Sequence, residues 1–138
     1  MEYHLGIVVA DFNADMTYEM LSLVQKEAEY EGNILEVVHV AGVYDMPLAV
    51  QTLLKKSRID GVLTLGVVLQ GGTNHDVIVA ENAAQKFVDL ACQFEKPVTL
   101  GVIGPRVTRE FALQRVEEYA LHAYHALIQL LQELAKIK

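Results

Sequence analysis

Residues 71–76 read GGTNHD and bring two glycines, a hydroxyl, an imidazole and a carboxylate together. Adjacent glycines let backbone N–H groups approach an anion, and a helix that begins directly after them adds the positive end of its dipole. His75 carries a group that titrates near neutral pH, as a general acid or base must. The stretch therefore predicts a site that binds an anion and moves protons. The alternatives are an ordinary strand-to-helix turn and a solvated histidine.

Three of the four arginines, Arg106, Arg109 and Arg115, fall within ten residues of one another. Guanidinium groups bind phosphate and carboxylate well, and this cluster stands out in a chain whose formal net charge is −7. The cluster favours a phosphate or carboxylate ligand, with a set of surface ion pairs as the alternative. His122 and His125 lie three residues apart, but no further ligands follow at a suitable spacing, so we expect no metal site.

Several classes of function are excluded by what the chain lacks. It has neither a GxGxxG pattern nor a Walker lysine, which argues against nucleoside triphosphates and dinucleotides. A pI near 5.1 argues against nucleic acid and anionic membranes as partners. The lone Cys92 allows no internal disulfide, the N-terminus has no basic region of a signal peptide, and no apolar run is long enough to span a membrane. We expect a cytoplasmic protein that acts on small molecules.

Strands alternate with helices along the chain. Apolar, β-branched stretches predict strands at residues 5–12, 33–40, 61–69 and 96–104. Apolar residues at helical spacing predict a helix after each strand, the first stopped by Gly32 and the last running from about Thr108 to Ala135. Asp45 can cap the second helix, and Pro47 is tolerated in its first turn.

Four βα units in succession predict one α/β domain over residues 1–138, a three-layer αβα sandwich. Right-handed crossovers favour a flavodoxin-like parallel sheet of order 2-1-3-4, in which ligands bind beyond the carboxyl ends of the strands. Glycine, polar and aromatic residues gather in the loops expected there, so we predict a small-molecule site formed by residues 11–13, 41–45, 70–76 and 104–108. Phe12 is then either a stacking surface or part of the core. The high apolar content of 52% suggests burial against other subunits.

The loop motifs carry a resemblance that covers about residues 5–135. The chain resembles the 6,7-dimethyl-8-ribityllumazine synthase family, especially its short archaeal form, in the order and spacing of five motifs: DFN (11–13), AGVYDMPLA (41–49), LGVVLQGGTNHD (65–76), KPVTLGV (96–102) and TREFALQR (108–115). The resemblance implies condensation of 5-amino-6-ribitylaminouracil with 3,4-dihydroxy-2-butanone 4-phosphate, the penultimate step of riboflavin biosynthesis. It also implies no metal or organic cofactor, and a homo-oligomer of one or more pentamers with sites shared between neighbours.

The resemblance assigns roles position by position. His75 would move protons, Phe12 would stack on the pyrimidinedione, and Arg115 would bind the phosphate. The remaining substrate-binding positions are Asn13, for which no contact is specified, Gly42, Val43, Tyr44 and Asp45 along the ribityl chain, Val67, Val68 and Leu69 at the ring edge, Gly72 and Thr73 at the phosphate, and Leu100 from a neighbouring subunit. Many relatives place a phosphate-binding lysine one or two turns after the arginine, where this chain offers only His122.

Two rival interpretations remain open at the level of sequence. The archaeal riboflavin synthase paralogue shares the expected fold and dismutates two lumazine molecules, but it resembles this chain less around the third loop. A non-catalytic protein that binds flavin or lumazine, or forms a shell, is the other alternative. Product analysis with lumazine as sole substrate separates the first alternative, and ligand binding without turnover would identify the second.

Overall fold

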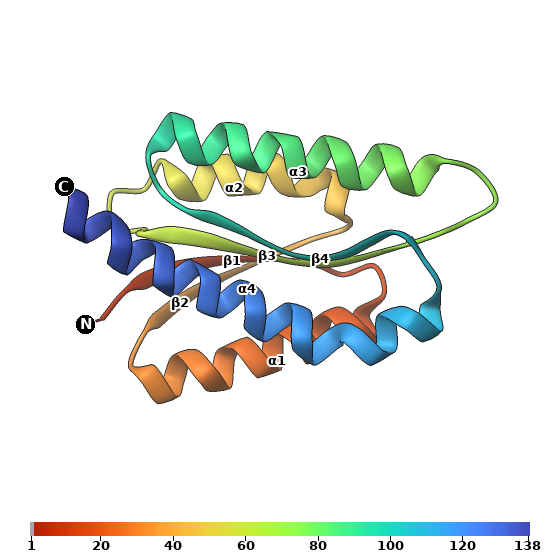
Figure 1. Cartoon of the computed structure of the whole chain (residues 1–138), viewed down its shortest axis with the longest axis horizontal. Helices are drawn as coiled ribbons and strands as arrows, with labels where there is room; N and C mark the ends of the chain where they lie inside the picture. Colours follow the sequence, from red (N-terminus) through yellow and green to blue (C-terminus); the bar gives the residue numbers. More distant parts are fainter. Residues whose placement is uncertain (1) are drawn as a thin grey trace.

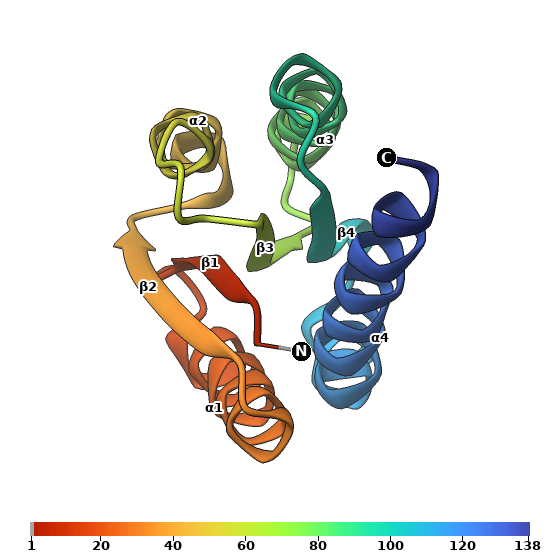
Figure 2. The ribbon, with the colours of Figure 1, turned by 90° about the vertical axis from the view of Figure 1, so that its left-hand side faces the viewer.

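The computed structural model describes residues 2–138 as a parallel sheet with helices on both faces (Figures 1 and 2). The predicted strand order, β2-β1-β3-β4, is confirmed. Helices α1 and α4 cover one face, and α2 and α3 cover the other (Figure 2). The elements in chain order are β1 (His4–Ala10), α1 (Ala14–Glu31), β2 (Ile34–Val40), the 3₁₀ turn η1 (Val43–Asp45), α2 (Met46–Leu54), β3 (Gly61–Leu69), α3 (His75–Phe94), β4 (Val98–Val107) and α4 (Arg109–Ile137).

The central strands are buried on both faces, as their continuous apolar sequences predict. Alternate residues of β1 point into two separate cores: Ile7 packs with Leu65 on the α1–α4 side, and Val8 packs with Val62 on the α2–α3 side. Thr64 is the polar exception in β3, and its hydroxyl donates to the carbonyl of Thr99 at 2.9 Å. The sheet is therefore a rigid support whose strand ends can hold functional groups in place.

Parallel pairing brings the carboxyl ends of all the strands to one edge. The register of β1 with β2 runs unbroken from His4–Ile34 to Ala10–Val40. The pairing of β3 with β4 shifts between Val67 and Leu69. The loops after β1, β2 and β3 consequently meet at the edge where the sequence places the site.

Two local predictions need correction. Asp45 is the N-cap residue of α2, as the sequence predicts, but its side chain does not cap that helix: its Oδ2 accepts from the N–H of Gly42 at 3.1 Å and closes η1 instead. Residues 104–108 were expected to form a loop, but β4 continues to Val107 through a cis Gly104–Pro105 peptide bond. The expected end of α1 is confirmed, since Gly32 follows the helix in the left-handed conformation that ends many helices. Within residues 2–138, no helix has the length and apolar character of a membrane span.

The extension of β4 depends on glycine at position 104. Its φ is +119°, and a Cβ atom there would lie 2.2 Å from the carbonyl oxygen of Val68. We predict that Gly104→Ala lowers the free energy of unfolding by about 1–3 kcal/mol, as overpacking does. Gly71→Ala is the matched control, because a Cβ at Gly71 meets nothing within 4 Å. Thermal or urea unfolding measures both variants, and equal midpoints would contradict the prediction.

Candidate active site

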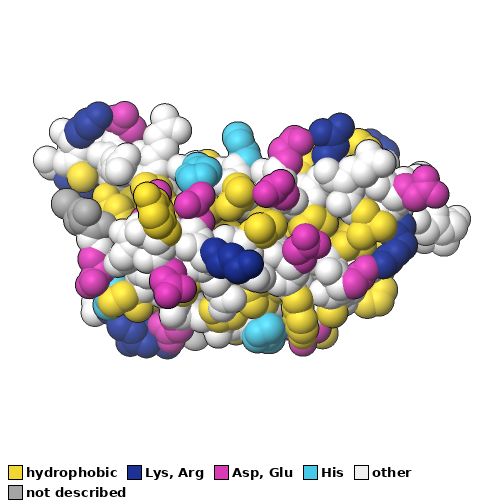
Figure 3. Space-filling view, turned by 90° about the horizontal axis from the view of Figure 1, so that it is seen from below, with side chains coloured by type: hydrophobic (Ala, Val, Ile, Leu, Met, Phe, Trp, Pro, Cys, Tyr) yellow, Lys and Arg dark blue, Asp and Glu magenta, His cyan; other side chains and the backbone are white. Residues whose placement is uncertain are grey.

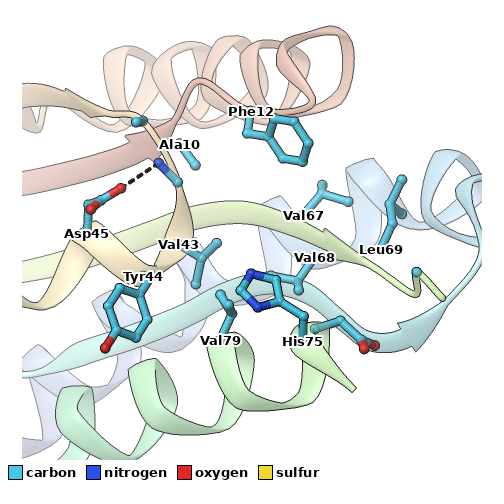
Figure 4. Close-up of a pocket in the computed structure, with 14 residues that line it drawn as sticks. Ala10, Phe12, Val43, Tyr44, Asp45, Val67, Val68, Leu69, His75 and Val79 are labelled. Carbon is cyan, nitrogen blue, oxygen red and sulfur yellow. Dashed lines mark hydrogen bonds between the residues drawn. The ribbon is translucent and has the colours of Figure 1, made fainter. Parts of the chain in front are cut away.

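A pocket of about 400 Å³ opens at the carboxyl edge of the sheet, between the ends of β1 and β3, η1 and the first turn of α3 (Figure 4). It unites residues from three of the four predicted loops with the end of β3. Its lining consists of Ala10, Phe12, Ala41, Gly42, Val43, Tyr44, Asp45, Val67, Val68, Leu69, Gly71, His75, Asp76 and Val79.

The floor of the pocket is apolar and rigid. Val67 and Val68 are buried at the end of β3, and Val43 of η1 belongs to the same apolar cluster as Val68. Val43 comes so close to β3 that a Cβ on Gly66 would lie 2.6 Å from its side chain. Such a floor suits the face of a flat ring, while the peptide groups at the strand end remain able to bind polar ring edges.

Phe12 stands above this floor. Its side chain is 72% exposed, so the structure excludes the alternative that Phe12 belongs to the core. The turn that presents it is held by Asn13, which has a φ of 65° and whose Nδ2 donates to the carbonyl of Val67 at 3.0 Å. Asn13 does not line the pocket; in this structure its amide fixes the position of the Phe12 loop relative to β3.

A hydrogen-bond network fixes the residue before Phe12. Asp11 accepts from the hydroxyl of Tyr18 at 2.7 Å and lies 2.9 Å from Nδ1 of His39. These hydrogen bonds, the one from Tyr18 foremost, lower the pKa of the Asp11 carboxyl and raise that of the Tyr18 phenol. The network ties the β1–α1 turn to both α1 and β2, so the base of the Phe12 loop is anchored on either side.

The second loop supplies most of the polar groups. Gly42 is extended, and its N–H is bound by the Asp45 carboxylate, which leaves the other carboxylate oxygen without a protein partner among residues 2–138. The exposed ring of Tyr44 stands at the mouth of the pocket (Figure 4). A carboxylate, a phenol and exposed peptide groups in a row can bind the hydroxyls of an extended sugar-like chain.

His75 is the first residue of α3, and its imidazole faces the pocket across from Phe12 (Figure 4). Its backbone N–H bonds to Oγ1 of Thr73 at 3.3 Å, whereas its ring makes no hydrogen bond within residues 2–138. The ring nitrogens are therefore available to a ligand. An imidazole in this position can donate a proton to a ligand in the pocket or accept one from it.

The loop before His75 is open on its outer side. Gly72 and Thr73 are exposed and lie next to Gly71 but outside the pocket lining. A Cβ at Gly71 or Gly72 would meet nothing within 4 Å, and neither residue has a positive φ. The chain itself does not require glycine here, so the space that the glycines leave suits a ligand that approaches the backbone.

Five residues that line the pocket have no individual role predicted from the sequence, although Ala41, Gly71 and Asp76 lie in the predicted loops. Asp76 is the most unusual, because this carboxylate is only 5% exposed and its Oδ2 accepts from the backbone N–H of Arg106 at 2.9 Å. An acidic residue in the first turn of a helix normally indicates a solvent-exposed position, so no local signal marks its burial. The other four are Ala10, Ala41, Gly71 and Val79.

Two predicted site residues lie elsewhere in the subunit. Leu100 is half-exposed on β4 and lines a separate depression of about 310 Å³ with Glu118, Tyr119 and His122. Arg115 lies on α4, where its guanidinium is 4.9 Å from the centre of the Phe111 ring and 3.0 Å from a carboxylate oxygen of Glu118. One subunit therefore does not bring these residues to the pocket. Among residues 2–138, no cluster of histidine, cysteine and carboxylate side chains is suited to a metal ion.

Comparison with known proteins gives one consistent result. The profile of the 6,7-dimethyl-8-ribityllumazine synthase family matches residues 2–135. A protein of that name from Saccharolobus islandicus is 50% identical over 134 residues, which cover 96% of this chain and 87% of the relative. The namesake from Methanococcus vannielii is 46% identical over 136 residues, 98% of this chain and 96% of the relative. The one from Sulfolobus acidocaldarius is 47% identical over 136 residues, 98% of this chain and 86% of the relative.

Proposed function

The chain belongs to the 6,7-dimethyl-8-ribityllumazine synthase family, and we propose that the pocket between Phe12 and His75 is its catalytic centre. The enzyme condenses 5-amino-6-ribitylaminouracil with 3,4-dihydroxy-2-butanone 4-phosphate and so forms the lumazine precursor of riboflavin. The observation that carries the proposal is the placement of an exposed aromatic ring and an unpaired imidazole on opposite sides of one apolar floor.

The chemistry consists of proton transfers and the loss of an anion. The amine attacks the ketone, water leaves, phosphate is eliminated, and the second amine closes the ring on the remaining carbonyl with loss of a second water. No electron transfer is involved, and we infer that neither a metal nor an organic cofactor takes part. His75 moves protons, and the two substrates held in one pocket react as if at high effective concentration.

The pyrimidinedione occupies the space between Phe12 and the valine floor. Stacking on Phe12 holds the plane of the ring, and the peptide groups of residues 67–69 bind its polar edge. The ribityl chain extends along residues 42–45, where the Asp45 carboxylate, Tyr44 and the backbone offer hydrogen bonds. This orientation points the reacting amine toward His75.

The phosphate lies in the loop that precedes α3. Backbone N–H groups at Gly72 and Thr73 and the start of a 20-residue helix favour a dianion there. His75 follows directly, so the imidazole stands beside the bond that breaks when phosphate leaves. The open space around both glycines supports this assignment.

Each site is completed by a neighbouring subunit. We infer a cytoplasmic homo-oligomer built from pentamers, in which Leu100 covers the ring bound next door and Arg115 reaches that neighbour's phosphate. The outer side of β4 supports this, because it is an unpaired strand edge with a half-exposed leucine beside a depression. The α1–α4 face mixes apolar side chains with charges of both signs (Figure 3).

The first prediction concerns proton transfer. His75→Ala should lower kcat by about ten- to a thousand-fold, because general acid–base assistance is worth roughly 10²–10⁴ and part of the condensation proceeds unaided. Lumazine fluorescence measures turnover, and circular dichroism should show an unchanged fold. His125→Ala is the control, since this exposed histidine on α4 pairs with Glu27 away from the pocket. Wild-type turnover in His75→Ala would remove His75 from the mechanism.

The second prediction concerns stacking. Phe12→Ala should weaken binding of the pyrimidinedione by about 1–3 kcal/mol, the worth of an aromatic stacking surface, and barely affect the butanone phosphate. Phe12→Tyr keeps the ring and should retain affinity. The unfolding midpoint should not move, because the side chain is exposed. Equal weakening of both substrates would contradict a stacking role.

The third prediction concerns the shared site. His75→Ala and Arg115→Ala, each nearly inactive alone, are unfolded and refolded together in equal amounts. In the mixture, the Arg115→Ala subunits supply His75 and the His75→Ala subunits supply Arg115. With random assortment in a ring, roughly a quarter of the interfaces place an intact His75 opposite an intact Arg115. Activity should recover to about that fraction. Mass spectrometry verifies that mixed rings have formed. If these mixed rings are as inactive as the two parent variants, the site is not shared between subunits.

A further inference from the structure

The arginines of this chain differ in how their charges are compensated. Three have a carboxylate partner. The guanidinium of Arg106 makes no hydrogen bond or ion pair to any of residues 2–138, and its side chain is exposed and therefore accessible to a ligand. The arginine cluster in the sequence is thus two surface ion pairs and one uncompensated cation. The three pairs are Arg58 with Glu36, Arg109 with Asp15, and Arg115 with Glu118.

The backbone of Arg106 is attached to both ends of the loop before α3. Its own N–H donates to the Asp76 carboxylate, which directly follows His75, at 2.9 Å. The carbonyl of the next residue, Val107, accepts from the N–H of Gln70 at 2.8 Å. Arg106 therefore lies beside the five residues that separate β3 from α3, with a long and flexible side chain.

Arg106 also adopts a conformation that must be enforced. Its φ of 62° lies in the left-handed region, which is unfavourable for a residue other than glycine. Asp76 opposes this cost, since its buried carboxylate has the Arg106 N–H as its side-chain hydrogen bond. A buried carboxylate without a partner is unfavourable, so the two groups hold each other in place. Strained backbone held by its surroundings is frequent at ligand sites.

We propose that Arg106 binds the phosphate of the butanone substrate in its own subunit, and that Asp76 is the residue that positions it. The proposal rests on the proposed function of the pocket. A phosphate monoester carries nearly two negative charges and three acceptor oxygens, which a guanidinium can bind through two parallel hydrogen bonds. Arg106 then supplies a second cation in a chain that has no lysine in the two helical turns after Arg115.

The test replaces Arg106 with glutamine. Arg106→Gln should raise KM for the butanone phosphate and the inhibition constant of inorganic phosphate by about ten- to a hundred-fold, the usual worth of hydrogen bonds to a charged group. KM for the pyrimidinedione and the unfolding midpoint should stay at wild-type values. Arg109→Gln is the matched control, an exposed arginine three residues away whose charge Asp15 already compensates.

The role of Asp76 is tested by coupling. Asp76→Ala should raise the same two constants, and Asp76→Asn, which keeps an acceptor oxygen, should restore most of the affinity. In the double variant with Arg106→Gln, Asp76→Ala should add little, because both changes remove one interaction. Effects that multiply, or that extend to the pyrimidinedione, would mean that Asp76 merely stabilises the fold and would overturn its positioning role.

The outcome also separates this inference from the pocket assignment. Unchanged phosphate constants in Arg106→Gln, together with the loss of turnover in His75→Ala, would overturn the role of Arg106 and leave the pocket assignment standing. Full activity in both His75→Ala and Phe12→Ala would overturn the pocket assignment, and the Arg106 proposal with it.

Discussion

The close approach of Gly104 to the carbonyl of Val68 is the contact on which the functional edge depends. Any residue other than glycine is strained at that position, because a Cβ would lie 2.2 Å from the oxygen and φ is +119°. With the strands this close, β4 continues past the register shift and brings Arg106 over the first turn of α3. The hydrogen bond from the Arg106 N–H to Asp76 then attaches the start of α3, which includes His75, to β4.

The site separates rigid from adaptable groups. Buried valines and strand peptides form the floor. The hydrogen bond that Asn13 donates to Val67 and the one that Asp45 accepts from Gly42 fix the loops that frame it. The ring of Phe12 and the imidazole of His75, which we propose contact the substrates, line the pocket and make no side-chain hydrogen bond within residues 2–138. A condensation of two substrates needs this combination, since the frame orients the reactants while the functional groups remain free to contact them.

In the proposed enzyme, one subunit carries two incomplete halves of a site. The pocket has an aromatic ring, an imidazole and a glycine-containing loop, while the outer edge of β4 has a half-exposed leucine beside a depression. The pairing of Arg115 with Glu118 is solvent-exposed and separated by one helical turn, so it costs little to exchange the carboxylate for a phosphate. Assembly and catalysis are linked in the proposed enzyme because each interface completes a site.

The sequence by itself determined the order of strands and helices, the topology and the edge that carries the site. These follow from local patterns: strands apolar on both faces, helical spacing of apolar residues, and loop residues such as Phe12 and His75 at strand ends. The tertiary structure alone decided that β4 extends to Val107, that Asp45 binds Gly42, and that Asp76 is buried. Asp76 and Arg106 are 30 residues apart, so their hydrogen bond forms only when α3 lies on β4. The ion pairs of the arginines also depend on tertiary structure. The sequence shows that Arg109 is present, but not that folding brings its guanidinium to the distant carboxylate of Asp15. Periodicity records which face of an element is buried, but it cannot say which polar groups will meet when the elements pack.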